Sequence, residues 1–200
     1  MSLKHSYTLI APFYEALIGK GTQRIRQNSW LNVGDVTGHK VLIPGIGTGL
    51  DIPFLPAGGH YTGFDLTPAM LARARQRALQ SDCNLILKLG DIHALDEADN
   101  QFDLIVMHLI LAVVPSPERA LNEMLRVLKP GGKIIILDKF LKLGERAVLR
   151  RFISFFMRHI ATRTDVVFEN VLAETRGLKI VSDEPVLMNG WFRRIELKRV

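Results

Sequence analysis

Short apolar runs alternate with segments of helical periodicity through the central part of the chain. The apolar runs predict five strands, at residues 39–44, 60–66, 84–91, 102–111 and 133–138. The fourth run is almost wholly apolar, which is typical of a strand that is covered on both faces. This alternation predicts an α/β fold with a doubly wound, Rossmann-like sheet that is mostly parallel.

Two helices are well marked between these runs, at residues 67–80 and 116–128. Thr67 and Ser116 are the predicted N-caps, because each precedes a proline, which favours the first position of a helix. The segment 129–132 (KPGG) predicts a turn that ends the second helix, since proline cannot continue it.

The last third of the chain has a different pattern. Residues 145–163 are basic and aromatic-rich and predict a helix, and residues 165–176 predict another that ends at Gly177. Strands at 178–188 and 191–200 are predicted to form an antiparallel hairpin around an Asn-Gly turn. We therefore expect a single domain over residues 1–200, in four parts: an N-terminal helical cap (1–37), a core (38–138), a lid or insert (139–164), and a C-terminal helix and hairpin (165–200).

Composition bounds the class of protein. The 200 residues are 48% hydrophobic, which is enough for the core of one domain. No run reaches the roughly 18 uninterrupted apolar residues of a membrane-spanning helix, and the N-terminus lacks the pattern of a signal peptide. The single cysteine, Cys83, cannot form an internal disulfide, which suits a reducing cytoplasm.

The formal net charge is +6, and the excess lies towards the two ends of the chain. A basic surface attracts nucleic acid, anionic lipid headgroups or acidic small molecules, and it also keeps a protein soluble. Within 145–163, arginines flank an aromatic stripe formed by Phe152, Phe155 and Phe156. Such a stripe is typical both of core packing and of an interfacial helix at a membrane, and both interpretations stay open.

Three glycines at alternate positions, Gly45, Gly47 and Gly49, follow the first predicted strand. A bare turn before a helix lets a ligand approach the backbone. The dinucleotide fingerprint G-x-G-x-x-G would need a glycine at Leu50, so a tightly held pyrophosphate is disfavoured. A ligand with an amino-acid end fits the turn better, and Asp65, which ends the next strand, is placed to accept hydrogen bonds from ribose hydroxyls. A plain strand-to-helix connection is the alternative.

Four segments in order, VLIPGIGTGLDIPFL, GFDLTPAML, GDIHALDEADNQFDLIV and LRVLKPGGKIIILD, resemble the signature segments of class I S-adenosylmethionine-dependent methyltransferases. The resemblance covers about residues 38–138 and identifies this part as the cofactor-binding core. It implies S-adenosyl-L-methionine as the methyl donor and S-adenosyl-L-homocysteine as the product. No metal is expected.

The resemblance also implies roles for matching residues. The turn that would pack against the methionine part of the cofactor consists of Gly45, Ile46, Gly47, Thr48 and Gly49. The residues that would surround the adenosine are Asp65 at the ribose, Leu66 and Met70 beside the adenine, and Gly90, Asp91 and Ile92 at its edge. Tyr14, with Tyr7 as a further candidate, would cover the cofactor, and His108 would lie near the transferring methyl. His108 and Tyr14 are the predicted catalytic residues, with His5 as a further candidate; a core role for His108 is the alternative.

Within the superfamily the chain looks similar to bacterial phosphatidylethanolamine N-methyltransferases and to ubiquinone/menaquinone C-methyltransferases. This implies a small-molecule or lipid acceptor, with a phospholipid amine as the first candidate and a soluble metabolite or quinone precursor as the alternative. It also implies a cytoplasmic monomer or homodimer with peripheral contact at the inner membrane face. A nucleic-acid acceptor is not expected, because residues 102–111 end in no Asn/Asp-Pro-Pro-aromatic tetrad.

One position departs from the family pattern. The family usually has an acidic residue two places before the first glycine, where this chain has Ile43, followed by Pro44. That acid helps to organise the turn and the ammonium group of the cofactor. Its replacement leaves open a non-catalytic binding protein with a degenerate donor site.

Overall fold

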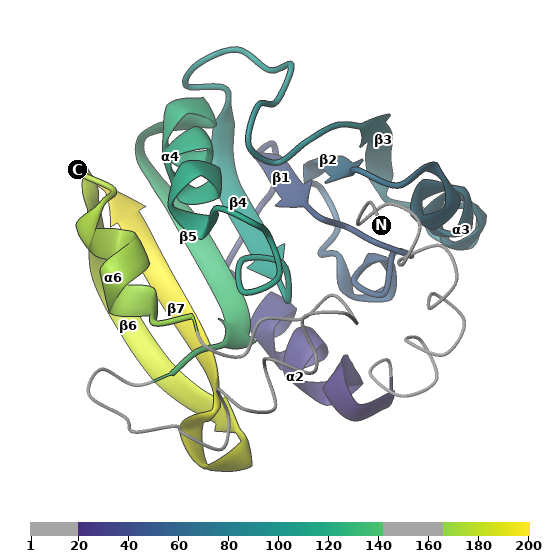
Figure 1. The fold of residues 1–200 in the computed structure, drawn as a ribbon. Coiled ribbons are helices and arrows are strands. Elements are labelled where there is room, and N and C mark those ends of the chain that lie inside the picture. Colours follow the sequence, from purple (N-terminus) through teal and green to yellow (C-terminus); the bar gives the residue numbers. More distant parts are fainter. Residues whose placement is uncertain (1–19, 142–165) are drawn as a thin grey trace.

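The computed structural model describes residues 20–141 and 166–200, which fold around one seven-stranded sheet (Figure 1). The strands are β1 (Lys40–Pro44), β2 (His60–Asp65), β3 (Asn84–Leu89), β4 (Phe102–His108), β5 (Leu128–Lys139), β6 (Leu178–Leu187) and β7 (Phe192–Arg199). Their order across the sheet is β3-β2-β1-β4-β5-β7-β6. Strands β1 to β5 pair in parallel, whereas β7 is antiparallel to both neighbours. The predicted mostly parallel sheet with a C-terminal antiparallel hairpin strand is confirmed.

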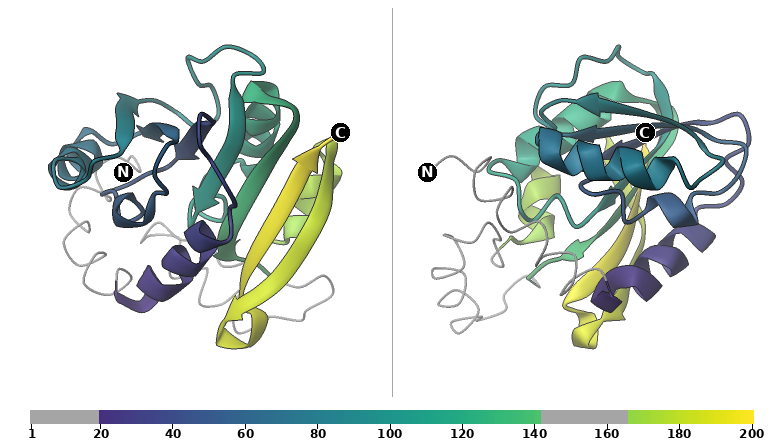
Figure 2. Two further views of the ribbon diagram at one scale, coloured as in Figure 1. Left: turned by 180° about the vertical axis from the view of Figure 1, so that it is seen from behind. Right: turned by 90° about the vertical axis from the view of Figure 1, so that its right-hand side faces the viewer.

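Helices cover both faces of this sheet. They are α2 (Lys20–Leu31), α3 (Pro68–Ala78), α4 (Pro117–Val127) and α6 (Phe168–Ala173), together with the 3₁₀ turns η2 (Ile52–Phe54) and η4 (Met188–Gly190). Helices α4 and α6 lie in front of the sheet in Figure 1 and behind it in the left view of Figure 2. Helix α2 lies beside the carboxyl end of β4 in both figures.

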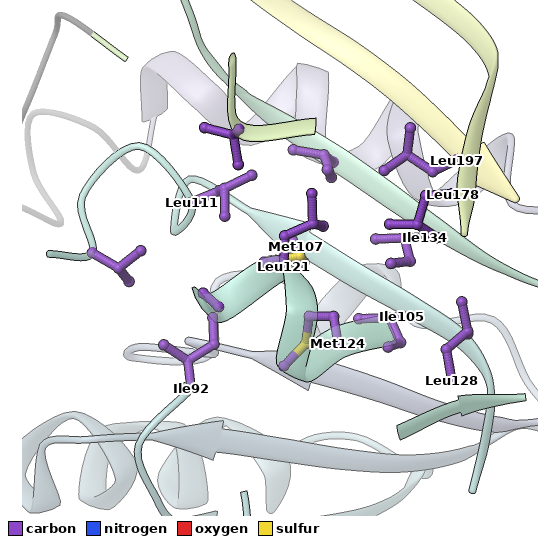
Figure 3. Close-up of a cluster of buried hydrophobic side chains, with 14 of the residues drawn as sticks. Ile92, Ile105, Met107, Leu111, Leu121, Met124, Leu128, Ile134, Leu178 and Leu197 are labelled. Carbon is purple, nitrogen blue, oxygen red and sulfur yellow. The ribbon is translucent and has the colours of Figure 1, made fainter. Parts of the chain in front are cut away.

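The buried side chains form two apolar clusters, one on each face. Along β4, Ile105 and Met107 belong to the cluster beneath α4 and α6, whereas Leu104 and Val106 belong to the cluster on the face of α3. Alternation with a period of two is what a strand covered on both faces requires. Figure 3 shows Leu121 and Met124 of α4 packed over β4 and β5.

Several element ends differ from the prediction. Strand β4 ends at His108 rather than at residue 111, because Leu109 has a φ of 58° and leaves the extended conformation. Strand β5 begins at Leu128 and includes the segment 129–132, since Leu128 pairs with Phe102. Helix α6 is shorter than the predicted 165–176.

The predicted N-cap positions of Thr67 and Ser116 are confirmed. Both occupy N-cap positions before proline, but neither side chain makes a cap hydrogen bond. At α3 the backbone N–H of Thr67 instead donates to Oδ1 of Asp65 at 2.8 Å. The carboxylate that ends β2 therefore also fixes the start of the next helix.

The glycine turn leads into the short 3₁₀ turn η2 rather than into a full α-helix. Pro53 lies in its first turn, and Pro56 follows just after it. Because proline lacks an N–H, Pro56 cannot continue the i→i−4 ladder, and the segment stays short.

Two predicted parts lie partly outside the described residues. The described portion of the N-terminal cap contains α2, but Tyr14, Tyr7 and His5 lie outside it. The predicted helix at 145–163, with its aromatic stripe, also lies outside the described residues and stays a prediction. Within residues 20–141 and 166–200, no helix has the length and apolar character needed to cross a membrane.

Candidate cofactor site

A cavity of about 590 Å³ lies at the carboxyl ends of β1, β2, β3 and β4. Such a crevice is the usual ligand site of an open parallel sheet. The predicted site residues that line it are Gly45, Ile46, Gly47, Thr48, Asp65, Leu66, Met70, Gly90, Asp91, Ile92 and His108. Gly49 is absent from this lining, and Tyr14 lies outside the described residues.

The three glycines of the turn all have positive φ but serve different purposes. A Cβ on Gly45 would lie 2.4 Å from Cγ1 of Ile110, so this position allows the loop after β4 to approach. A Cβ on Gly49 would lie 2.5 Å from Cδ1 of Ile52 and 3.1 Å from Cα of Ala74, so Gly49 packs the turn against α3. At Gly47 the nearest atom among the described residues is the Gly45 carbonyl oxygen at 3.9 Å, which leaves open cavity for a ligand.

Asp65 organises the turn from the end of β2. Its Oδ2 accepts the N–H of Gly47 at 2.9 Å, and its Oδ1 accepts the N–H of Thr67. Burial raises the pKa of Asp65, although these backbone hydrogen bonds act in the opposite direction. Hydroxyl donors from a ligand would complete the hydrogen bonding of this partly buried carboxylate, which fits a ribose.

Asp91 follows β3 and interacts with a residue that was not predicted, His93. Oδ1 of Asp91 lies 2.6 Å from Nδ1 of His93 and also accepts its backbone N–H. Burial works against the ionised form, but the hydrogen bonds from His93 and the charge of Arg119 hold the pKa of Asp91 below its usual value. Nε2 of His93 is buried and has no partner among the described residues.

His108 ends β4 and lies against the cavity, as expected, but its ring is fully engaged by the protein. Nδ1 lies 2.7 Å from Oδ1 of Asp51, and Nε2 lies 2.9 Å from Oγ of Ser29 on α2. Because a carboxylate only accepts, we assign the ring proton to Nδ1, and Nε2 then accepts the Ser29 hydroxyl. The arrangement has the distances of a Ser-His-Asp triad, yet Ser29 is buried and does not line the cavity.

Asp51 is the centre of a buried polar network that was not predicted. Its Oδ2 accepts a hydrogen bond from Nη1 of Arg26 at 2.6 Å, and its Oδ1 accepts one from Nε1 of Trp30 at 3.1 Å. Burial alone would raise the pKa of Asp51, but the charge of Arg26 and the bonds from His108 and Trp30 hold it well below the usual range. One feature of the sequence could have indicated this network. Asp51 comes just after the glycine turn, in a chain that has Ile43 where the family usually has an acidic residue.

The replacement at Ile43 has a physical explanation. Ile43 is almost fully buried in the apolar cluster beneath α3, where an isolated carboxylate would be costly. The turn is held instead by Asp65 and by the N–H of Ile46, which donates to the carbonyl of Phe64 at 2.9 Å. The geometry of the glycine turn therefore does not require an acid at this position.

An apolar loop, residues 109–115, forms the remaining wall of the cavity through Leu109, Ile110, Val113, Val114 and Pro115. Two contacts with β5 hold this loop. The N–H of Leu109 donates to the carbonyl of Leu137 at 2.8 Å, and the N–H of Ala112 donates to Oδ2 of the buried Asp138 at 3.0 Å.

Comparisons with known proteins agree with this geometry. The family model described as "Methyltransferase domain" matches residues 42–136. A phosphatidylethanolamine N-methyltransferase from Cereibacter sphaeroides is 31% identical over 189 residues, which cover 93% of this chain and 92% of that protein. A demethylmenaquinone methyltransferase from Renibacterium salmoninarum is 37% identical over 134 residues, 64% of this chain and 55% of that protein.

A solved structure from Thermotoga maritima, described as a SAM-dependent methyltransferase and possible histamine N-methyltransferase, has the same fold. Its TM-score is 0.74 at 19% identity, and the match covers 99% of this chain and all of that one. The fold and the family match together define an α/β methyltransferase. The chain belongs to the class I S-adenosylmethionine-dependent methyltransferases, and its cofactor is S-adenosylmethionine.

The residues present fit this cofactor. The open space at Gly47 admits a ligand to the backbone, and Asp65 retains acceptor capacity for ribose hydroxyls. When bound, the cofactor supplies an activated methyl group on its sulfonium. The protein contributes position, since the glycine turn and the loop 109–115 line the cavity from two sides.

Proposed function

We propose that this enzyme methylates the amine of a phospholipid headgroup of the phosphatidylethanolamine type. The observation that carries the proposal is the length of the likeness to the phosphatidylethanolamine N-methyltransferase relative, which runs over 93% of this chain. The match to the demethylmenaquinone methyltransferase relative covers 64%. The likeness to the lipid enzyme thus includes parts of the chain outside the cofactor-binding core.

The state of His108 supports an amine acceptor. Its ring nitrogens are hydrogen-bonded within the protein to Asp51 and Ser29, so Nε2 could take a proton from the acceptor only by giving up the Ser29 hydroxyl. A carbon acceptor must lose a proton and benefits from a general base. An amine that enters as the free base needs mainly alignment with the methyl and the leaving sulfur.

The apolar wall supports a lipid-like acceptor. Residues 109–115 present Leu109, Ile110, Val113 and Val114 to the cavity, and the described wall carries no acid there. An apolar surface suits the glycerol and acyl region beside a headgroup better than a small charged metabolite. Peripheral contact with the inner membrane face is part of this proposal, because the acceptor is held in a bilayer.

Methylation of a quinone precursor by the same machinery is the second candidate. It is favoured by the higher identity of 37% within the matched part of the demethylmenaquinone methyltransferase relative. It requires a group outside the described residues to act as base, for example the predicted Tyr14. Calorimetry with S-adenosylhomocysteine checks that the donor site of the purified protein is intact in either case.

The test uses S-adenosylmethionine labelled on its methyl group and the full-length protein. The label is followed into the organic phase with vesicles of phosphatidylethanolamine and phosphatidylglycerol, and with vesicles of phosphatidylglycerol alone. We expect label in the organic phase only with the first vesicles, on a product that comigrates with N-methylated phosphatidylethanolamine. Asp65→Ala is the control with an impaired donor site.

Two further acceptors make the result decisive. Soluble phosphoethanolamine tests whether the headgroup alone suffices, and a demethylated quinone in detergent tests the second candidate. Labelling of the quinone at a higher kcat/KM than the phospholipid would overturn the proposal. Labelling of phosphoethanolamine alone would support an amine acceptor. It would contradict the lipid acceptor and the membrane contact that the proposal includes.

A further inference from the structure

Arg26 is a buried cation at the cavity whose role the glycine motif does not explain. It lies on α2, is only 6% exposed, and lines the cavity together with Gly47 and Thr48. Among the described residues that line the cavity, it is the only lysine or arginine. Burying a guanidinium is costly unless it is paired, so its position calls for an explanation.

Only part of the guanidinium is used by the protein. Nη1 donates to Asp51 and Nε donates to Oγ1 of Thr22 at 3.3 Å. In the part of the chain that the structure describes, Nη2 has no hydrogen-bond partner. Asp51 neutralises and orients the side chain, and three of its five N–H groups, one on Nη1 and two on Nη2, remain for a ligand.

The cavity is electrostatically polarised. Of its acids, Asp65 ends β2 and Asp91 follows β3. Arg26 comes from α2, which meets the end of β4 through the Ser29–His108 contact. The cofactor has a matching asymmetry, with hydroxyl and amino donors on its adenosine and a carboxylate at its amino-acid end. The acids suit the first end and the arginine suits the second.

We propose that Arg26 binds the carboxylate of the amino-acid end of S-adenosylmethionine, and that Asp51 holds Arg26 in place to do so. Asp51 is thus a positioning residue that touches the ligand only through the arginine. This assignment concerns the donor alone and does not depend on which acceptor is methylated.

The test compares two ligands that differ by the carboxylate. Calorimetry with S-adenosylhomocysteine and with its decarboxylated analogue, S-adenosyl-3-thiopropylamine, is performed on the wild-type protein and on Arg26→Lys. Lysine keeps the positive charge beside Asp51 but loses the second arm of the guanidinium. We expect Arg26→Lys to raise the dissociation constant of S-adenosylhomocysteine by about tenfold or more. The dissociation constant of the analogue should rise by less than about twofold.

Arg24→Lys is the matched control, since Arg24 is an exposed arginine on the same helix, and it should change neither dissociation constant. If Arg26→Lys raises the dissociation constants of both ligands by the same factor, Arg26 only shapes the site, and this result overturns the proposal. The proposal is also overturned if Arg26→Lys binds S-adenosylhomocysteine as the wild type does but has a raised KM for the acceptor. That result would assign Arg26 to a phosphate of the acceptor. If Arg26→Lys lacks a cooperative unfolding transition, the double variant Arg26→Gln/Asp51→Asn, which removes both buried charges, takes its place with the same expected outcomes.

Discussion

Nδ1 of His108 lies 2.7 Å from Oδ1 of Asp51, and both side chains are almost fully buried beneath α2. The same carboxylate pairs with Arg26 and Trp30, so one acid joins the end of β4, the segment after the glycine turn, and α2. This contact connects the cofactor site to the stability of the fold.

Replacing Asp51 by Asn should strongly destabilise the protein, because Arg26 would lose its buried counter-charge. We expect the free energy of unfolding in urea to fall by about 3–5 kcal/mol. Asp99→Asn is the control, since Asp99 also lies 2.6 Å from an arginine, Arg126, but is largely exposed. The free energy of unfolding of Asp99→Asn should fall by less than about 1 kcal/mol. Equal losses in the two variants would contradict a stabilising role for the buried network.

The pH dependence of this effect has a defined sign. The folded pKa of Asp51 lies below the ordinary value of 3.8, so its ionised form stabilises the fold at every pH above that value. The contribution is lost as the pH falls from 3.8 towards the folded pKa. The stability difference between wild type and Asp51→Asn should therefore be constant near neutrality and narrow only in that acidic window.

His108→Gln tests whether the histidine acts as a base. A glutamine amide can donate to Asp51 and accept from Ser29, so the network survives while proton transfer is lost. We expect kcat to fall by less than about tenfold, whereas loss of a general base typically costs about 10²–10⁴. A loss of that larger size in a variant with unchanged thermal stability would show that His108 exchanges protons with the acceptor.

Local spacing made part of the site predictable, and distance along the chain hid the rest. Gly47 and Asp65 follow or end adjacent parallel strands, so the order of the strands alone places them side by side. The positions of Leu66, Met70 and Asp91 are predictable for the same reason, because each lies at or beyond the carboxyl end of β2 or β3. The Asp51 contacts with Arg26 and His108 join residues 25 and 57 positions apart, and no periodic signal marks such pairs.

The end of β4 was missed for a different reason. Leu111 is fully buried although it lies in a loop, so the apolar run continues past the strand and conceals its end at His108.

Asp65→Ala should weaken donor binding, and it should also lower the free energy of unfolding because the N–H groups of Gly47 and Thr67 lose their acceptor. A charge-assisted hydrogen bond to the ribose is worth about 1.5–3 kcal/mol, so the dissociation constant of S-adenosylhomocysteine should rise accordingly. Asp82→Ala, at an exposed acid after α3, is the control. An unchanged dissociation constant in Asp65→Ala would mean that the ribose is held elsewhere.

The affinity of the wild-type protein should also depend on the ionisation of Asp65. Burial raises the pKa of this carboxyl, so the accepting form is lost at a higher pH than for an ordinary aspartate. Affinity should therefore fall as the pH drops through the raised pKa and be constant above it. Calorimetry at a series of pH values from neutral down towards the ordinary pKa of aspartate measures this, and Asp65→Ala should show no such decline.

Gly47→Ala separates the backbone role of the turn from its role in binding. Gly47 and Gly131 both have positive φ, 58° and 76°, and neither has a described atom close to the position of an added Cβ. Alanine should therefore cost about 1–2 kcal/mol of folding stability at either site. Only at Gly47 does the added methyl enter the cavity, so only Gly47→Ala should also lose affinity for S-adenosylhomocysteine. If both variants bind the ligand as wild type does, the cofactor does not lie against the turn, and the open space at Gly47 has another purpose.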